Sequence, residues 1–304
     1  MKITRCQFEL LTFIEKQGIT EYSLRKISDT LNISRMKVIE DVDFLIKNSF
    51  IRKSGDKLSI TKNGLDVLEP FRVKRAIILA AGFGSRMAPV TLDTPKPLVS
   101  VNGKRIIETI LDSLIANNIT DITIVRGYKK EKFNELLKKY PFIKFVDNEI
   151  YDKTNNISSV MAVLDKIDEC YICEADLMIS NPDIIQKYQY SSNYLASYSL
   201  ETDDWSFELI DGHTANYKKG GTYRFNAYGI SYWTKDDSKK LRDDIEAIYQ
   251  TEDGKNIFWD RIPLDICKHN YKVEIRQCEK SDIIEIDNFY ELVLLDPHYK
   301  DYKN

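Results

Sequence analysis

From Arg75 onward, short apolar runs alternate with segments whose apolar residues recur every three or four positions. The uninterrupted run over 76–81 is typical of a strand buried on both faces of a parallel sheet, and runs over 121–125 and 143–147 predict two further strands. Helical spacing predicts helices over 106–117 and 130–140. This alternation predicts an α/β fold, with a mostly parallel, mixed sheet flanked by helices and connected by right-handed crossovers.

The first part of the chain has a different pattern. Amphipathic spacing over 4–17 predicts a helix that ends at Gly18, a second helix begins after the N-cap Ser23, and a turn at Asn32-Ile33-Ser34 leads into a third. Residues 51–60 predict a two-stranded hairpin. This order resembles the winged helix-turn-helix domains of bacterial regulators. We therefore expect two domains, a winged helix-turn-helix domain over residues 1–72 and an α/β domain over 73–304.

Composition and charge place the chain among ordinary globular proteins. It is 43% hydrophobic and 30% charged, with a net charge of −3. The amphipathic start and the absence of an apolar run near about 18 residues argue against a signal peptide or a membrane span, so we expect a cytoplasmic protein with no membrane partner. Five scattered cysteines argue against a disulfide framework. A homodimer remains open.

The first domain could bind DNA. Residues 1–74 hold 14 Lys and Arg against 10 Asp and Glu, which is a mild basic excess. The helix after Ser34 would enter the major groove. Basic residues placed to contact bases or phosphates are Arg35, Lys37, Arg52, Lys53 and Lys57. Acidic residues on the same helix, which would repel DNA, are Glu40, Asp41 and Asp43. DNA binding and a packing or dimerisation module both remain open.

The strand over 76–81 leads into candidate chemistry. It ends in a Gly-x-Gly-x-Arg loop with Gly82, Gly84 and Arg86. Glycines let backbone N–H groups approach phosphate oxygens closely, and an arginine can clamp the same oxygens with two bonds. Lys96 follows between two prolines, whose restricted φ angles suggest a side chain that must be aimed. The stretch predicts an anion-binding site at the end of a buried strand.

Two later strands end in acidic residues. One precedes Glu174-Ala175-Asp176, and the other carries Glu285-Ile286-Asp287. Carboxylates at strand ends can bind a hard cation that bridges triphosphate oxygens. The acidic residues at these two strand ends are therefore candidate ligands for such a cation.

The stretch from Leu79 to Leu98 resembles the signature of the nucleotidyltransferases that activate sugars and alcohol phosphates, which have a Rossmann-like core. The resemblance implies that Asp176 and Asp287 hold Mg²⁺, that Lys96 contacts the α-phosphate and the acceptor phosphate, and that Arg86 holds the departing phosphates. Lys96 and Arg86 are thus the expected catalytic residues. The nucleotide-binding residues implied are Leu79, Ala80, Ala81, Gly82, Gly84, Ser85, Arg86, Lys96, Asn155, Asn156 and Ser158. The paired asparagines offer donors and acceptors suited to a pyrimidine edge.

Within that family the chain is most similar to the bacterial choline-phosphate cytidylyltransferases, from about Arg75 to about Leu295. The motifs that carry this similarity are Asn155-Asn156, Glu174-Ala175-Asp176, Asp204-Trp205, Gly229-Ile230-Ser231-Tyr232-Trp233, Phe258-Trp259-Asp260 and Glu285-Ile286-Asp287. The resemblance implies CTP and phosphocholine as substrates. Aromatic faces and nearby carboxylates suit a quaternary ammonium. The expected acceptor-binding residues are Trp205, Tyr228, Trp259, Asp260 and Glu285.

Two alternatives stay open. Ile157 and Ser158 stand where the choline enzymes have aromatic residues, so the acceptor could carry a primary amine, as 2-aminoethylphosphonate and phosphoethanolamine do, or be another sugar or alcohol phosphate. The chain could also be a winged-helix regulator that senses CTP or a choline metabolite without turning it over.

Overall fold

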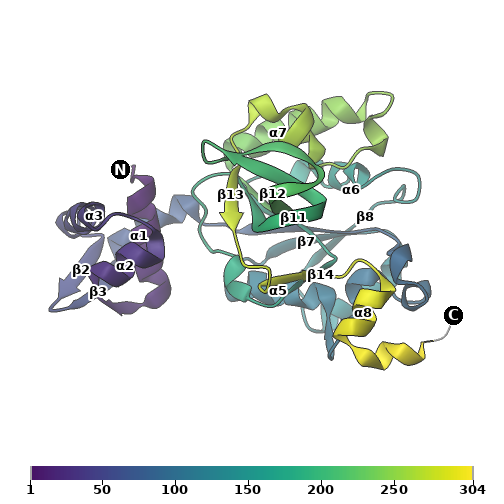
Figure 1. Ribbon diagram of the computed structural model, residues 1–304, viewed down its shortest axis with the longest axis horizontal. Coiled ribbons are helices and arrows are strands. Elements are labelled where there is room, and N and C mark those ends of the chain that lie inside the picture. The colour runs from purple at the N-terminus through teal and green to yellow at the C-terminus, as the bar shows by residue number, and fades with distance from the viewer. Residues whose placement is uncertain (1, 303–304) are drawn as a thin grey trace. The chain divides into compact units, whose positions relative to one another are not determined.

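The computed structural model describes residues 2–302, and the chain divides into two compact units at the junction of Arg72 and Val73. Figure 1 shows both units as ribbons. The short stretch Tyr188–Tyr190 belongs to the first unit, although the chain on both sides of it belongs to the second. Each unit has its own hydrophobic core and is described separately.

The first unit combines four helices with a three-stranded antiparallel sheet of order β1-β3-β2. Its elements are α1 (Arg5–Gln17), β1 (Ile19–Glu21), α2 (Leu24–Leu31), α3 (Arg35–Lys47), β2 (Ile51–Ser54), β3 (Lys57–Ile60) and α4 (Lys62–Leu68). Side chains of Thr4, Ser23 and Ser34 accept hydrogen bonds from the first turns of α1, α2 and α3, so all three are N-caps and the predicted N-cap at Ser23 is confirmed. Phe71 stacks on Tyr190 with ring centroids 5.4 Å apart.

The second unit is built on a seven-stranded mixed sheet of order β11-β13-β12-β9-β4-β7-β8. Its strands are β4 (Arg75–Ala80), β7 (Asp121–Arg126), β8 (Lys144–Asp147), β9 (Cys170–Glu174), β11 (Asn193–Ile210), β12 (His213–Trp233) and β13 (Glu274–Gln277). Strands β9, β4, β7 and β8 run parallel, and β12 pairs antiparallel with β9. This is the mixed, mostly parallel core that the sequence predicts.

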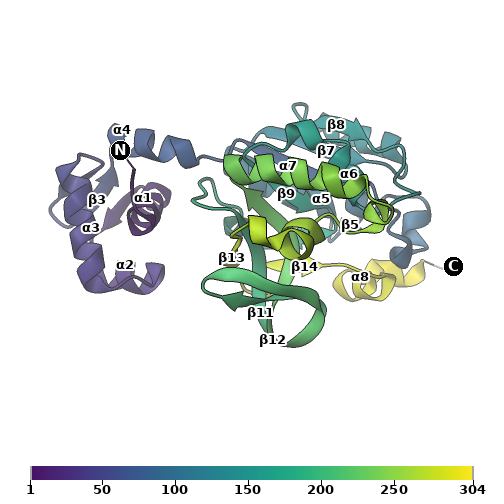
Figure 2. The same cartoon turned by 90° about the horizontal axis from the view of Figure 1, so that it is seen from above.

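Helices cover both faces of this sheet. They are α5 (Ile106–Ala116), α6 (Ile157–Met161) and α7 (Lys235–Tyr249), while α8 (Phe289–Leu295) lies near the C-terminus. Ile78 of β4 packs in the cluster that contains Leu111 of α5, whereas Ile77 packs in the cluster that contains Leu241 of α7. Alternate residues of β4 therefore point to opposite layers, which Figures 1 and 2 show on either side of the sheet.

One predicted helix differs in type. The segment Lys130–Lys138 is a run of 3₁₀ turns rather than an α-helix. Phe133 and Leu136, three positions apart, are both buried, and a three-residue period keeps them on the same side.

Strands β11 and β12 form a long hairpin that folds back on itself. Ser206 of β11 faces Lys218 and also Asn226, both in β12. Arg224 is only 2% exposed inside this fold, where its Nε donates to Ser206 Oγ at 2.8 Å and its Nη1 to Glu208 Oε1 at 2.6 Å. The buried guanidinium therefore joins the two layers of the hairpin.

Parallel strands bring their carboxyl ends to one edge of the sheet. The glycine loop follows β4 there, and Asp176 follows β9. A small antiparallel pair, β10 (Leu177–Ile179) with β14 (Ile283–Glu285), carries the chain segment of Asp287 to the same place. The remaining short pair is β5 (Ser100–Val101) with β6 (Lys104–Arg105). Within residues 2–302, no helix combines the length and the apolar character needed to cross a bilayer.

Candidate active site

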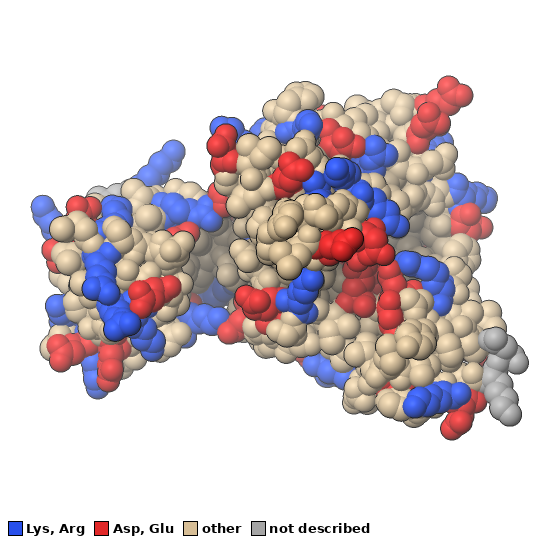
Figure 3. Space-filling view, in the orientation of Figure 1, with Lys and Arg blue, Asp and Glu red and all other residues tan. Residues whose placement is uncertain are grey.

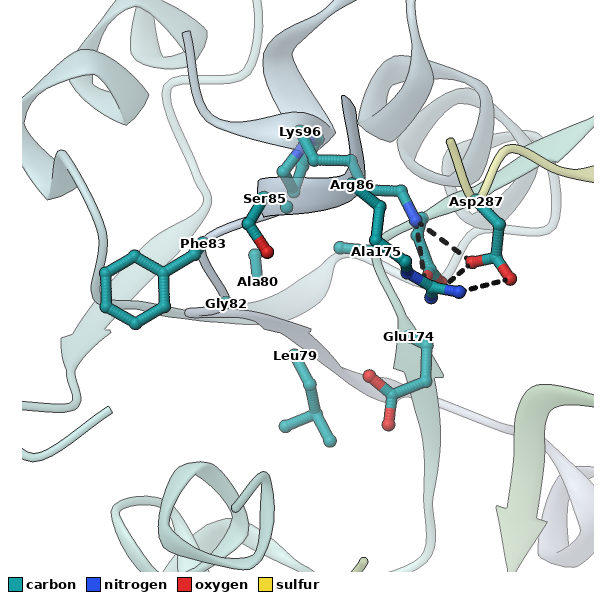
Figure 4. A pocket seen from close by; sticks show the side chains of 13 residues that line it. Leu79, Ala80, Gly82, Phe83, Ser85, Arg86, Lys96, Glu174, Ala175 and Asp287 are labelled. Atoms are coloured by element: carbon teal, nitrogen blue, oxygen red, sulfur yellow. Dashed lines mark hydrogen bonds and ion pairs between the residues drawn. The ribbon is translucent and has the colours of Figure 1, made fainter. Parts of the chain in front are cut away.

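Two cations and two carboxylates meet at this edge of the sheet. Nζ of Lys96 lies 3.1 Å from Oδ2 of Asp176 and 3.6 Å from Oδ1 of Asp287. The guanidinium of Arg86 donates to both oxygens of Asp287, from Nη1 at 3.1 Å and from Nη2 at 2.8 Å. Figure 4 shows these contacts as dashed lines. Residues from the glycine loop, β9 and the segment after β14 thus form one cluster.

Gly84 allows Lys96 to approach the loop. Its φ of +62° lies in the left-handed region, and a Cβ at this position would come within 2.6 Å of the Cβ of Lys96. Lys96 itself starts a 3₁₀ turn between Pro95 and Pro97, and its side chain is 9% exposed. The loop and the lysine are therefore packed together as one unit.

A third carboxylate completes an acidic group. Asp176, Glu285 and Asp287 each offer an oxygen, and the three oxygens lie within 4.8 Å of one another. Reduced hydration and the neighbouring carboxylates of Asp176 and Asp287 raise the pKa of Glu285 above its ordinary value. Clustered carboxylate oxygens are the donor set that a hard cation such as Mg²⁺ prefers, so these residues fit that ion. Figure 3 shows acidic side chains gathered in the middle of the visible face of the second unit.

Two adjoining cavities open beside this cluster. The larger, about 330 Å³, is lined by the glycine loop together with Lys96, Asp176 and Asp287. The smaller, about 220 Å³, is lined by residues that follow β8 and by the start of α6. Leu79, Gly82 and Glu174 line both cavities. All eleven predicted nucleotide-binding residues line one cavity or the other.

Several known proteins are similar to this chain. Residues 75–204 match the family model described as nucleotidyl transferase. A 2-aminoethylphosphonate cytidylyltransferase of Lancefieldella rimae is 38% identical over 230 residues, covering 74% of this chain and 92% of that protein. The chain belongs to the nucleotidyltransferase family.

Further similarities fall within the same family. A choline-phosphate cytidylyltransferase of Streptococcus pneumoniae is 31% identical over 70% of this chain and 93% of its own length. The solved structure of a CTP:phosphocholine cytidylyltransferase from the same organism superimposes with a TM-score of 0.69 at 30% identity, covering 75% of this chain and 99% of that one. The expected nucleotidyltransferase with a Rossmann-like core is therefore confirmed, and its relatives are cytidylyltransferases.

The paired asparagines of this nucleotidyltransferase are already engaged. Asn156 donates from Nδ2 to Glu174 Oε1 at 3.0 Å and accepts at Oδ1 from the backbone N–H of Trp259 at 3.0 Å. Asn155 donates to the carbonyl of Asn256 at 3.2 Å and accepts from the N–H of Asn156 at 2.7 Å. Both side chains line the smaller cavity, but their polar atoms hold its wall together. Each amide still has a second N–H and a second lone pair, so the base-reading role stays a prediction.

The sequence reasoning missed several residues of the smaller cavity, namely Asn148, Tyr151, Thr154 and Ser159. Asn148 donates to the hydroxyls of Ser158 and Ser159, at 2.8 and 3.1 Å. The ring of Tyr151 lies against Gly127, where a Cβ would come within 2.6 Å of the tyrosine Cγ. Their positions in the sequence could have indicated this role. Asn148 directly follows β8 and Tyr151 lies three residues later, at the same sheet edge as the glycine loop.

Glu174 lies between the two cavities. Its Oε1 also accepts from the indole Nε1 of Trp259 at 3.3 Å, and burial followed by the charge of Asp176 raises its pKa to about 8. Gly229 makes room for it, since a Cβ there would come within 2.3 Å of the Cγ of Glu174. The glutamate is therefore fixed by a neighbour that lacks a side chain.

The predicted acceptor residues are divided between core and surface. Trp259 is 1% exposed and packs edge-on against Trp233, and Asp260 is enclosed where the hydroxyls of Tyr217 and Tyr194 donate to it at 2.7 and 3.3 Å. Trp259 and Asp260 thus support the site from within the core. Burial of Asp260 raises its pKa.

The other three acceptor candidates lie elsewhere. Trp205 is half-buried and stacks on Tyr217 with centroids 5.0 Å apart, while the hydroxyl of Tyr228 shares a hydrogen bond with Ser197 at 2.9 Å. Glu285 lies with the acidic group instead of in an aromatic box. The spacing of Glu285 and Asp287, two residues apart, could have indicated this shared position.

Proposed function

We propose that this nucleotidyltransferase transfers CMP from CTP to a small phosphonate or phosphate that carries a primary amine, with 2-aminoethylphosphonate as the favoured acceptor and phosphocholine as the second candidate. The relatives from Lancefieldella rimae and Streptococcus pneumoniae support a cytidylyl donor and a nitrogen-bearing acceptor. The acceptor preference rests on the side chains around the site.

One observation carries that preference. The indole ring of Trp259 is packed against Trp233 in the core, and the positions after the paired asparagines are the buried residues Ile157 and Ser158. A quaternary ammonium is held by exposed aromatic faces, whereas a primary ammonium donates three hydrogen bonds and is held by carboxylates. Glu174, which is not one of the three clustered acidic residues, offers a carboxyl group that lines both cavities. This group suits the primary amine better.

The two cavities suit the two ends of the donor. The triphosphate would lie over residues 82–86, whose backbone N–H groups and arginine favour phosphate oxygens. The cytosine would occupy the smaller cavity beside Tyr151, whose ring is half-buried there. Asp176, Glu285 and Asp287 would hold Mg²⁺, which neutralises negative charge on phosphate oxygens when it is bound.

The reaction needs no nucleophile from the protein. An anionic oxygen of the acceptor forms a bond to the α-phosphorus, and the bond from that phosphorus to the bridging oxygen breaks, so that pyrophosphate leaves with the electron pair. Lys96, aimed by its prolines and by Gly84, donates N–H groups to the α-phosphate and acceptor oxygens as charge builds there. Arg86 holds the departing phosphates. Catalysis is thus positioning together with charge neutralisation.

The direct test measures pyrophosphate release with CTP, UTP, ATP or dTTP, each paired with 2-aminoethylphosphonate, its N-trimethyl analogue, ethylphosphonate or glucose 1-phosphate. We expect turnover with CTP and 2-aminoethylphosphonate, and at least about tenfold lower kcat/KM with the trimethyl and amine-free analogues, equivalent to about 1.4 kcal/mol. Equal rates for the amine and its trimethyl analogue would contradict the preference for a primary amine and make phosphocholine the favoured acceptor. Absence of turnover with every pair would contradict the enzyme assignment of this site.

A second function concerns the first unit. Its helices α2 and α3, joined by a turn at residues 32–34, and its hairpin of β2 and β3 support the winged helix-turn-helix prediction and, with it, binding to DNA. Arg52, Lys53 and Lys57 are exposed on the hairpin. On α3, however, the exposed residues include Met36, Ile39, Glu40 and Asp43. We therefore place the DNA contact on the hairpin and on the start of α3 at Arg35.

Fluorescence anisotropy with duplex DNA from the region upstream of the protein's own gene tests this second function at 50 and 200 mM salt. We expect binding that weakens with salt, and loss of binding when Arg52, Lys53 and Lys57 are all changed to Gln. A variant with Lys16, Lys47 and Lys62 changed to Gln removes the same charge elsewhere in the unit and serves as the control. Absence of binding at 50 mM salt would contradict DNA binding and favour the alternative, in which the first unit is a packing or dimerisation module.

A further inference from the structure

Arg86 is hydrogen-bonded to Asp287, a carboxylate that the metal would need. Its guanidinium takes both oxygens of Asp287 at 2.8 and 3.1 Å, and Lys96 lies 3.1 Å from Asp176. Two of the three clustered carboxylates are therefore paired with protein cations. A divalent cation that used Asp287 would compete with a two-point arginine bond.

Arg86 is also free to leave. Its side chain is 68% exposed, against 9% for Lys96, and it belongs to the loop that lines the larger cavity. An exposed arginine-carboxylate pair is weak enough to be exchanged for a stronger partner. The oxygens of a triphosphate carry more charge than one carboxylate and match the same planar fork. The same guanidinium can thus serve two partners in turn, and Figure 4 shows it beside Asp287.

We infer that Arg86 is a latch: in the free protein it holds Asp287 and disfavours metal binding, and an incoming triphosphate draws it away and makes the carboxylate available. This inference rests on the proposed function, since it takes a nucleoside triphosphate as the ligand that releases Arg86. The metal and the nucleotide then bind cooperatively, and by linkage each raises the affinity of the protein for the other by the same factor. The metal joins the site together with the triphosphate rather than ahead of it.

If Arg86 acts as this latch, removing its guanidinium should strengthen metal binding while it weakens nucleotide binding. Mn²⁺ binding to the nucleotide-free protein is measured from the electron paramagnetic resonance signal of unbound Mn²⁺. Arg86→Gln should bind Mn²⁺ roughly threefold to tenfold more tightly than wild type, because it removes a nearby positive charge and frees Asp287. Arg105→Gln is the matched control, because it also removes one arginine from an ion pair, with Glu135, outside the two cavities. Equal or weaker Mn²⁺ binding by Arg86→Gln, or an equal gain in the control, would overturn the latch.

A second arm measures coupling. With α,β-methylene CTP present, wild type should bind Mn²⁺ more tightly than alone, and the gain should be smaller in Arg86→Gln. Arg86→Lys, which keeps the charge but not the two-point bond, should lie between wild type and Arg86→Gln in nucleotide-free Mn²⁺ affinity. If wild type does not bind the analogue, the proposed function fails, while the nucleotide-free comparison still judges whether Arg86 holds the carboxylate. Circular dichroism of each variant confirms the fold.

Discussion

Replacing Gly229 by alanine should damage the site without touching any ligand. The added Cβ would lie 2.3 Å from the Cγ and 2.8 Å from the Cβ of Glu174, and both distances are too short for non-bonded carbons. Overfilling a packed site costs about 1 to 3 kcal/mol, so the free energy of unfolding should fall by that amount. Glu174 must also move away from Asn156 and Trp259, and its displacement changes the wall shared by both cavities.

Urea denaturation and steady-state kinetics together test this reasoning. We expect kcat/KM to fall about tenfold or more, because sub-ångström misplacement of site groups is costly. In a Glu174→Ala background the clash with Cγ is gone, so Gly229→Ala should cost less stability there than in wild type. If Gly229→Ala cost the same stability with and without the glutamate side chain, the packing argument would be refuted.

Three further predictions concern the site. Lys96→Ala should lower kcat about 100- to 1000-fold, as removal of one charge-stabilising donor does in other enzymes, while equilibrium dialysis still detects CTP binding; unchanged turnover would remove Lys96 from the mechanism. Asp176→Asn should weaken Mn²⁺ binding at least about tenfold in the presence of a CTP analogue, and unchanged affinity would exclude Asp176 as a ligand. Tyr151→Leu should raise the KM for CTP about 5- to 100-fold if the ring stacks on the base, whereas Phe142→Leu, an exposed aromatic outside both cavities, should leave it unchanged.

The parts of the site carried by backbone pattern were predictable from the sequence. The apolar run before Gly82 indicated β4, and parallel strands place their carboxyl ends together, so Asp176 was expected near the glycine loop. The alternation of strands and helices likewise gave the mixed sheet. Asp287 was found through the family resemblance, because nothing local in the sequence shows that β14 pairs with β10.

The sequence pattern could not predict which groups each side chain contacts. The side chain of Asn156 is fixed by one hydrogen bond to Glu174 and one from the backbone of Trp259, which is 103 positions away. Trp259 has the right ring for a cation, but that ring completes the core. Composition shows which groups a site could use, and only the three-dimensional partners decide which of them remain available.

The short stretch Tyr188–Tyr190 makes the first unit discontinuous in sequence. Phe8, Phe71 and Tyr190 pack their rings together, and the backbone N–H of Gln189 donates to the carbonyl of Phe71 at 2.8 Å. Cleavage between Arg72 and Val73 would therefore leave neither fragment intact. The N-terminal fragment would lack Tyr190 of the aromatic cluster, and the C-terminal fragment would keep Tyr188 and Tyr190 without the residues they pack against. Transfer of the first unit to another protein would require both pieces to be transplanted as a pair.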